Sequence, residues 1–167
     1  IAAAFHHPAT RVLLCAPPQQ GENPKVIKLA AGLLLAQTPY FAVLDDDTVL
    51  LEGALGQAAG QLSRGDLVTG LPLYTRGTNL WSALVAAFVN GSALITYPTA
   101  AALHQQRTLN GMFYLGRKAD LAALGGFDAI RETLTDDYAM ARLYLDAGKT
   151  LVQSRIVHPI STEVRDA

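Results

Sequence analysis

The sequence has little charge and almost no cysteine, and both shortages limit what the protein can be. Only 16% of its 167 residues are charged, half are hydrophobic, and the formal net charge is −1. Because lysine and arginine do not cluster, the chain lacks the basic surface that follows a nucleic-acid backbone, and we expect no nucleic-acid partner. The one cysteine, Cys15, cannot form an internal disulfide and is expected to be a buried thiol.

The sequence also lacks an initiating methionine and a signal-peptide pattern, so we expect it to be a piece of a longer protein. Its length suits one domain. No stretch of about 20 residues is apolar enough to predict a membrane span. The nearest stretch, residues 80–103, is uncharged but is interrupted by Asn90-Gly91 and Pro98. Two interpretations stay open for it: a helical hairpin packed in the core, which is the default, or a segment lying on a membrane surface.

Apolar periodicity and turn residues predict alternating strands and helices. The expected strands are 11–16, 40–44, 66–71, 112–116 and 150–157, and the expected helices are 25–37, 50–62, 118–124 and 135–147. This alternation predicts an α/β layered fold with a mostly parallel sheet. In such sheets, ligands bind beyond the carboxyl ends of the strands.

Three consecutive acids end the strand expected at 40–44. Side chains alternate along a strand, so Asp45 and Asp47 are expected to point one way and Asp46 the other. Two neighbouring carboxylates repel each other, and Mg²⁺ or Mn²⁺ with oxygen ligands would relieve that repulsion. A structural alternative is equally open, in which Asp47 or Thr48 caps the helix that follows.

A second acidic cluster, Asp136-Asp137, lies about ninety residues later at the expected start of a helix. Its structural interpretation is that Thr135 caps this helix and the two acids favour its first turn. Its functional interpretation is that one cluster holds a metal while the other provides a base.

Six short motifs, in the same order, resemble those of the ceramide glucosyltransferase-like proteins, which form glycosyltransferase family 21 and are similar to the family 2 nucleotide-sugar transferases. They cover the chain from about Arg11 to Val157. The motifs are Gly21-Glu22-Asn23-Pro24-Lys25, Leu44-Asp45-Asp46-Asp47, Gly70-Leu71-Pro72, Asn110-Gly111-Met112 with Arg117-Lys118-Ala119-Asp120-Leu121, Gly125-Gly126, and Asp136-Asp137-Tyr138-Ala139-Met140.

The resemblance implies a single catalytic core domain, residues 1–167, with a GT-A-like three-layer fold, truncated at both ends. It implies an inverting transfer of a sugar from a nucleotide-diphosphate donor such as UDP-hexose to a hydroxyl of a lipid such as ceramide. The implied roles are a general base for Asp137, metal binding for Asp45, Asp47 and His158, and nucleotide-sugar binding for Asn23, Lys25, Asp45, Gly111 and Asp136. The implied cofactor is Mg²⁺ or Mn²⁺.

Two family features are missing from the chain. An earlier strand ending in Asp would precede it, and a Gln/Arg-x-x-Arg-Trp segment would follow Asp137, whereas the chain ends at Arg165-Asp166-Ala167. The family's membrane helices are absent as well, so the fragment is expected to be soluble or peripheral, while the parent protein is expected at the cytoplasmic face of a membrane, attached through parts outside this chain. Two alternatives stay open: a polysaccharide-synthase-like transferase with a glycan acceptor, and a catalytically dead binding or scaffold module.

Overall fold

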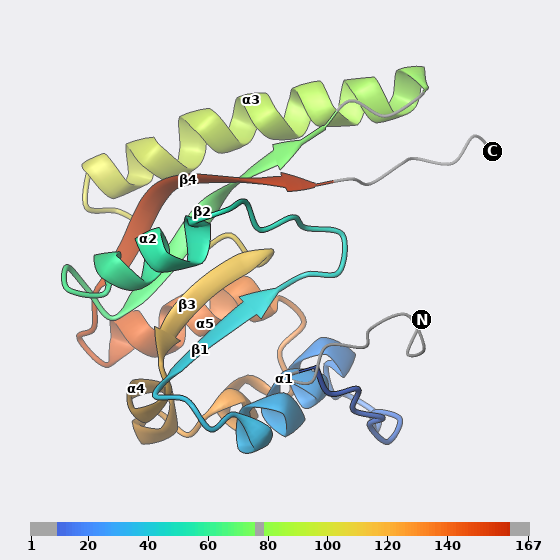
Figure 1. Cartoon of the computed structure of the whole chain (residues 1–167), viewed down its shortest axis with the longest axis vertical. Coiled ribbons are helices and arrows are strands. Elements are labelled where there is room, and N and C mark those ends of the chain that lie inside the picture. Colours follow the sequence, from blue (N-terminus) through green and yellow to red (C-terminus); the bar gives the residue numbers. More distant parts are fainter. Residues whose placement is uncertain (1–9, 76–78, 161–167) are drawn as a thin grey trace.

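A sheet with helices on both faces forms the protein, and a computed structural model describes its residues 10–75 and 79–160 (Figure 1). Within these residues the elements are α1 (Pro24–Leu35), β1 (Tyr40–Leu44), α2 (Ala54–Gln61), β2 (Leu67–Tyr74), α3 (Leu80–Ala102), β3 (Phe113–Arg117), α4 (Lys118–Ala123), the 3-10 helix η2 (Phe127–Ile130), α5 (Asp136–Asp146) and β4 (Leu151–Ile160). The expected α/β class is confirmed.

The strand order in the sheet is β1-β3-β2-β4. β3 runs antiparallel to both β1 and β2, whereas β2 and β4 are parallel. The expected mostly parallel pairing is therefore not found, because β3 enters between β1 and β2 in the opposite direction. β1, β2 and β4 still run the same way, so their carboxyl ends share one edge of the sheet.

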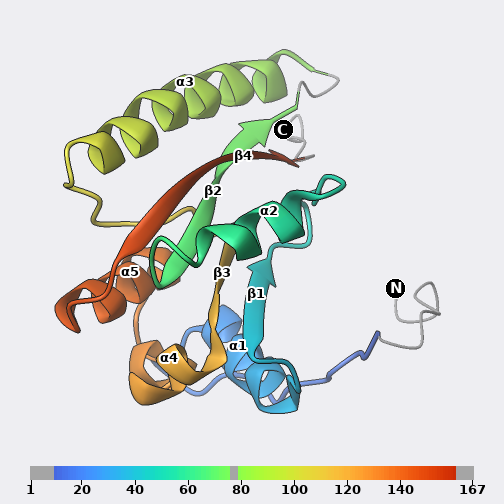
Figure 2. The same ribbon diagram turned by 60° about the vertical axis from the view of Figure 1, so that its left-hand side comes forward.

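Two apolar clusters lie on the two faces of the sheet, as side-chain alternation along its strands requires. The larger joins the sheet to α1, α4, η2 and α5, and its buried residues are Val26, Phe41, Val43, Leu67, Leu109, Tyr114, Leu121, Phe127, Ile130, Met140, Ala141 and Tyr144. The smaller joins the sheet to α2 through Ala58, Leu62, Val68, Phe113 and Leu115. Helices, sheet and helix thus form three layers (Figure 2).

The strand predicted at 11–16 is wrong. This segment has no regular secondary structure and no partner strand among the described residues, and Leu14 is 93% exposed. Cys15 is only half-buried, which also corrects the expected buried thiol. An apolar run forms a strand only where a neighbouring strand pairs with its main chain, and none of the described residues does so here. The chain end at residues 165–167 lies outside the described residues.

Residues 80–102 form one continuous helix, α3, so the predicted hairpin in the core is wrong. The Asn90 side chain accepts a hydrogen bond from the Tyr74 main-chain N–H at 2.8 Å and donates one to its carbonyl at 2.9 Å. Asn90 therefore fastens the middle of the helix to the end of β2 instead of breaking the helix. Pro98 lies near the C-terminal end of α3. By length and composition alone α3 could cross a membrane, which corrects the expectation that no stretch is apolar enough, and only 17% of its most apolar 18 residues are buried.

Candidate active site

The Lys25 ammonium group joins two of the predicted site carboxylates. Its Nζ atom lies 2.8 Å from Asp45 Oδ1 and 3.3 Å from Asp136 Oδ2, and it donates a hydrogen bond to the Gly111 carbonyl at 3.2 Å. These residues come from the start of α1, the end of β1, the start of α5 and the loop before β3. The structure thus brings together four of the residues that the sequence motifs singled out.

This arrangement favours the protonated, positively charged form of Lys25. Burial lowers the pKa of Lys25, but its hydrogen bond to Asp45 and the charges of Asp136 and Asp45 outweigh this, so the pKa lies above its usual value. Asp137 adds another carboxylate beside Gly111. One cation among Asp45, Asp136 and Asp137 leaves this group with a negative net charge, which suits a further cation and opposes a bare anion.

Gly111 and Asp137 are in close contact. A Cβ atom added at Gly111 would lie 3.1 Å from Asp137 Cβ and 3.7 Å from its Oδ2. The loop that carries Gly111 is fixed to β2 by the buried Thr69 hydroxyl. This hydroxyl accepts a hydrogen bond from the Asn110 N–H at 3.0 Å and donates one to the Phe113 carbonyl at 3.0 Å. The other oxygen of Asp137, Oδ1, accepts from the Tyr138 N–H at 2.7 Å.

The capping alternative for the three consecutive acids is wrong. α2 begins at Ala54, and its N-cap is Gly53 in a left-handed conformation with φ of 75°. Neither Asp47 nor Thr48 therefore caps the helix. Instead, the chain turns directly after β1, where the Thr48 N–H donates a hydrogen bond to the Asp45 carbonyl at 3.1 Å. Burial, followed by the charges of Asp47 and Asp45, raises the pKa of Tyr74. β1 ends at Leu44 and Asp46 and Asp47 lie in the turn that follows, so the expectation that Asp45 and Asp47 face the same way stays a prediction.

Asn23 holds two segments of the site together. Its Oδ1 accepts from the N–H groups of Lys25 and Val26, which makes it the N-cap of α1. Its Nδ2 donates to the carbonyls of Thr133 at 2.8 Å and Leu134 at 3.3 Å, just before α5. Because both polar atoms of the side chain are engaged, Asn23 positions Lys25 against Asp136, and its predicted contact with a nucleotide stays a prediction.

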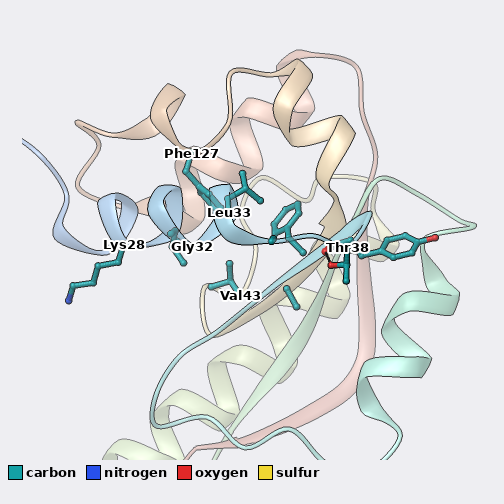
Figure 3. A pocket seen from close by; sticks show the side chains of 11 residues that line it. Lys28, Gly32, Leu33, Thr38, Val43 and Phe127 are labelled. Atoms are coloured by element: carbon teal, nitrogen blue, oxygen red, sulfur yellow. Dashed lines mark hydrogen bonds between the residues drawn. The ribbon is translucent and has the colours of Figure 1, made fainter. Parts of the chain in front are cut away.

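An open cleft lies beside this group between α1 and β1. It has a volume of about 620 Å³ and is lined by Asn23, Pro24, Lys25, Lys28, Leu29, Val43, Leu44, Asp45 and Asp46. An adjoining apolar pocket of about 350 Å³ shares Lys28, Leu29 and Val43 with it and continues along the outer edge of β1. Figure 3 shows this pocket, with Lys28 and Thr38 at its two ends and Leu33, Val43 and Phe127 between them.

His158 is separate from the carboxylates. Its side chain is fully buried, its ring lies 4.3 Å from that of Phe113, and it fills the space above Gly70. Burial lowers its pKa, against the opposing effect of the Val49 main chain. Within residues 10–75 and 79–160, no group of three His, Cys, Asp or Glu side chains is arranged around a common metal position. The structure therefore does not bring His158 together with Asp45 and Asp47, and packing accounts for its position.

Sequence reasoning missed Tyr97, which α3 brings to the site. Burial and then the charge of Asp137 raise the pKa of its hydroxyl. Tyr97 also lines an apolar pocket of about 250 Å³ between α3 and β2, together with Pro72, Val89, Ser92, Ala93, Thr96, Thr108 and Met112. The sequence offered only one signal, a tyrosine inside an uncharged helix, and such residues usually serve in packing.

Comparison with known families identifies the chain. The model of glycosyl transferase family 21 matches residues 1–165, nearly the whole length, so the chain belongs to that family and the predicted resemblance is confirmed. A search of curated proteins found no match. Family membership indicates a glycosyltransferase, which takes a nucleotide-sugar donor and an acceptor.

Proposed function

We propose that this member of glycosyl transferase family 21 is the catalytic core of an inverting hexosyltransferase that uses a UDP-hexose type of donor and a lipid acceptor such as ceramide. One observation carries the proposal. Lys25, Asp45, Gly111, Asp136 and Asp137, which come from motifs more than a hundred residues apart, meet in one group beside an open cleft. The run of acids at the end of β1, and the shared direction of three strands, further support a GT-A type of fold.

Asp137 is the general base in this proposal. The acceptor hydroxyl must lose a proton as it attacks the sugar carbon, and a carboxylate within about 3 Å can take that proton. Asp137 Oδ2 lies 3.7 Å from the position that a Cβ of residue 111 would take, so glycine there leaves room beside this oxygen. Attack from the side opposite the leaving diphosphate inverts the configuration of the sugar carbon.

Lys25 and Lys28 line the cleft and provide positive charge for a diphosphate. The carboxylates around Lys25 would repel that diphosphate unless a further cation were present, and Mg²⁺ usually binds through one or two carboxylates together with phosphate oxygens. Asp45 and Asp47 fit this requirement because both directly follow β1, at the edge of the cleft, and the charges of both raise the pKa of the same group, the Tyr74 hydroxyl. Mg²⁺ or Mn²⁺ held there would stabilise negative charge on the leaving group.

The acceptor site is proposed at the pocket between α3 and β2. Its lining is mostly apolar, and Tyr97 in that lining lies within the field of Asp137. An apolar acceptor would place its hydrocarbon part in this pocket and its hydroxyl near the base. We therefore favour a lipid over a glycan acceptor, and a place for the parent protein at the cytoplasmic face of a membrane.

Isothermal titration of Mn²⁺ and UDP tests the donor side. UDP is expected to bind only when Mn²⁺ is present, and Asp45→Asn and Asp47→Asn are each expected to lower the affinity by about tenfold or more. Asp146→Asn is the matched control, because Asp146 is exposed at the far end of α5 and pairs with Arg142. Equal affinity in all four proteins would remove the two acids from the donor site.

A further inference from the structure

Helix α3 buries small side chains and exposes large apolar ones, the reverse of what is usual for a helix in water. Its fully buried residues, which face the sheet, are small: Ser82, Ala86 and Ala93. Its large apolar residues face outward, and Phe88 is 77% and Ile95 72% exposed. A surface helix of a soluble domain normally buries its large apolar side chains and exposes polar ones. The outward surface of α3, defined here as Leu80, Trp81, Leu84, Phe88, Leu94 and Ile95, therefore needs an apolar neighbour.

The outward surface also lacks charged residues, which usually surround the apolar centre of a protein–protein interface. No Asp, Glu, Lys or Arg occurs between Leu80 and Leu103. Protein interfaces surround their apolar centre with a polar rim, whereas α3 carries no charged residue along its 23 residues, about 35 Å at the usual helical rise. One of its exposed polar groups is satisfied inside the helix, since the Ser92 hydroxyl donates to the Phe88 carbonyl at 2.6 Å.

The attachment of α3 decides how it meets such a neighbour. Asn90 bonds both main-chain groups of Tyr74, and α3 packs along β2 and β4. The helix therefore lies flat against the domain, with one side on protein and the other open along its whole length (Figures 1 and 2). A helix fixed in this way cannot cross a bilayer alone, but it can lie in the plane of its surface.

We propose that the outward surface of α3 inserts into the headgroup and acyl boundary of a lipid bilayer. This deepens the proposed function, because Tyr97 on the same helix lines the proposed acceptor pocket together with Met112, the residue after Gly111, so binding would set that pocket at the membrane surface. The attraction is apolar, so it needs no anionic lipid and is insensitive to salt.

Trp81 provides a direct measurement, because it is the one tryptophan in the chain and belongs to the outward surface. Its fluorescence is recorded while neutral phosphatidylcholine vesicles are added to the whole chain. A shift to shorter wavelength, and quenching by lipids brominated on their acyl chains, is expected at both low and high salt. No shift, or a shift that salt abolishes, would overturn the proposal.

Paired variants distinguish vesicle binding through α3 from non-specific vesicle binding through other exposed apolar residues. Phe88→Glu with Ile95→Glu is expected to weaken vesicle binding by about tenfold or more, because two large apolar side chains are lost from the inserted surface. Leu34→Glu with Leu134→Glu is the matched control, since these residues are 84% and 94% exposed outside α3. Equal losses in both pairs would overturn the assignment to α3.

Two further measurements distinguish membrane binding from dimer formation and from loss of the donor site. Sedimentation velocity without lipid tests whether a second copy of the chain covers α3 instead, and a dimer that the Phe88→Glu pair dissociates, without vesicle binding, would refute the membrane proposal. Mn²⁺-dependent binding of UDP in the same variants tests the donor site separately. That binding is expected to stay unchanged, so failure of the membrane proposal and failure of the proposed function give different results.

Discussion

Gly111 and Asp137 approach each other so closely that a methyl group on Gly111 would lie 3.1 Å from Asp137 Cβ. This spacing is tighter than ordinary van der Waals contact, so a larger residue at 111 must push Asp137 away. Because residue 111 has no side chain, it leaves the space beside Asp137 Oδ2 free, 3.7 Å from where a Cβ would lie. The glycine therefore acts through its small size, and it keeps the proposed base accessible.

Gly111→Ala is expected to lower turnover more than it lowers stability. Displacing a catalytic group by a fraction of an ångström weakens proton transfer strongly, while the loop itself is held by Thr69 and can shift slightly. Steady-state kinetics and urea unfolding measure the two effects. Gly91→Ala is the control, because its added Cβ meets nothing within 4 Å, and a comparable loss of turnover there would contradict this explanation.

Replacing Asp136 and replacing Asp137 are expected to have different effects on the enzyme. Asp137→Asn keeps the shape but removes the base, so turnover is expected to fall by about a hundredfold or more while UDP binding stays largely intact. Asp136→Asn removes a partner of Lys25, so it is expected to weaken donor binding and stability first. Loss of transfer in Asp136→Asn alone would show that the roles within the pair are reversed.

Lys25 is expected to stabilise the fold up to strongly alkaline pH. Its pKa is raised above 10.5 in the folded chain, so its stabilising effect is complete below the unfolded value and disappears as pH rises through the folded value. The difference in unfolding free energy between wild type and Lys25→Met should therefore be constant at neutral pH and shrink above pH 10.5. Urea unfolding across this range measures it.

Lys28→Met, on the exposed side of the same helix, is the control for Lys25. It is expected to change stability little at any pH, because surface charges contribute little on their own. A pH profile that is the same for both variants would mean that the ion pairs of Lys25 with Asp45 and Asp136 have no measurable effect on stability.

Gly70→Ala is expected to destabilise the protein by about 2 kcal/mol or more, the range for overpacking a core. Its added Cβ would overlap the buried His158 ring and lie 3.0 Å from the Ile156 carbonyl. Gly60→Ala in α2 meets nothing within 4 Å and is expected to be neutral or slightly stabilising. Thermal unfolding compares the two, and similar melting temperatures would show that the His158 ring can move aside.

Local patterns predicted most elements well. The strand at 40–44 was predicted with its observed ends, and the helix predicted at 135–147 appears as Asp136–Asp146. The helix predicted at 50–62 is shorter, because Gly53 adopts a left-handed conformation and starts α2 at Ala54. Periodicity reports the environment of near neighbours in sequence, and it places element ends less reliably than the elements themselves.

The sequence alone determined which residue types this protein has for its chemistry: acids at the ends of local elements, Asn23 and Lys25 in one short motif, and an uncharged stretch at 80–103. The tertiary structure decided which of these meet. Lys25 touches Asp45 and Asp136, β3 separates β1 from β2, and α3 turns its large side chains outward. Local propensity reflects the nearest residues in the chain, whereas these contacts join segments as much as 111 residues apart and depend on how the sheet and its helices pack.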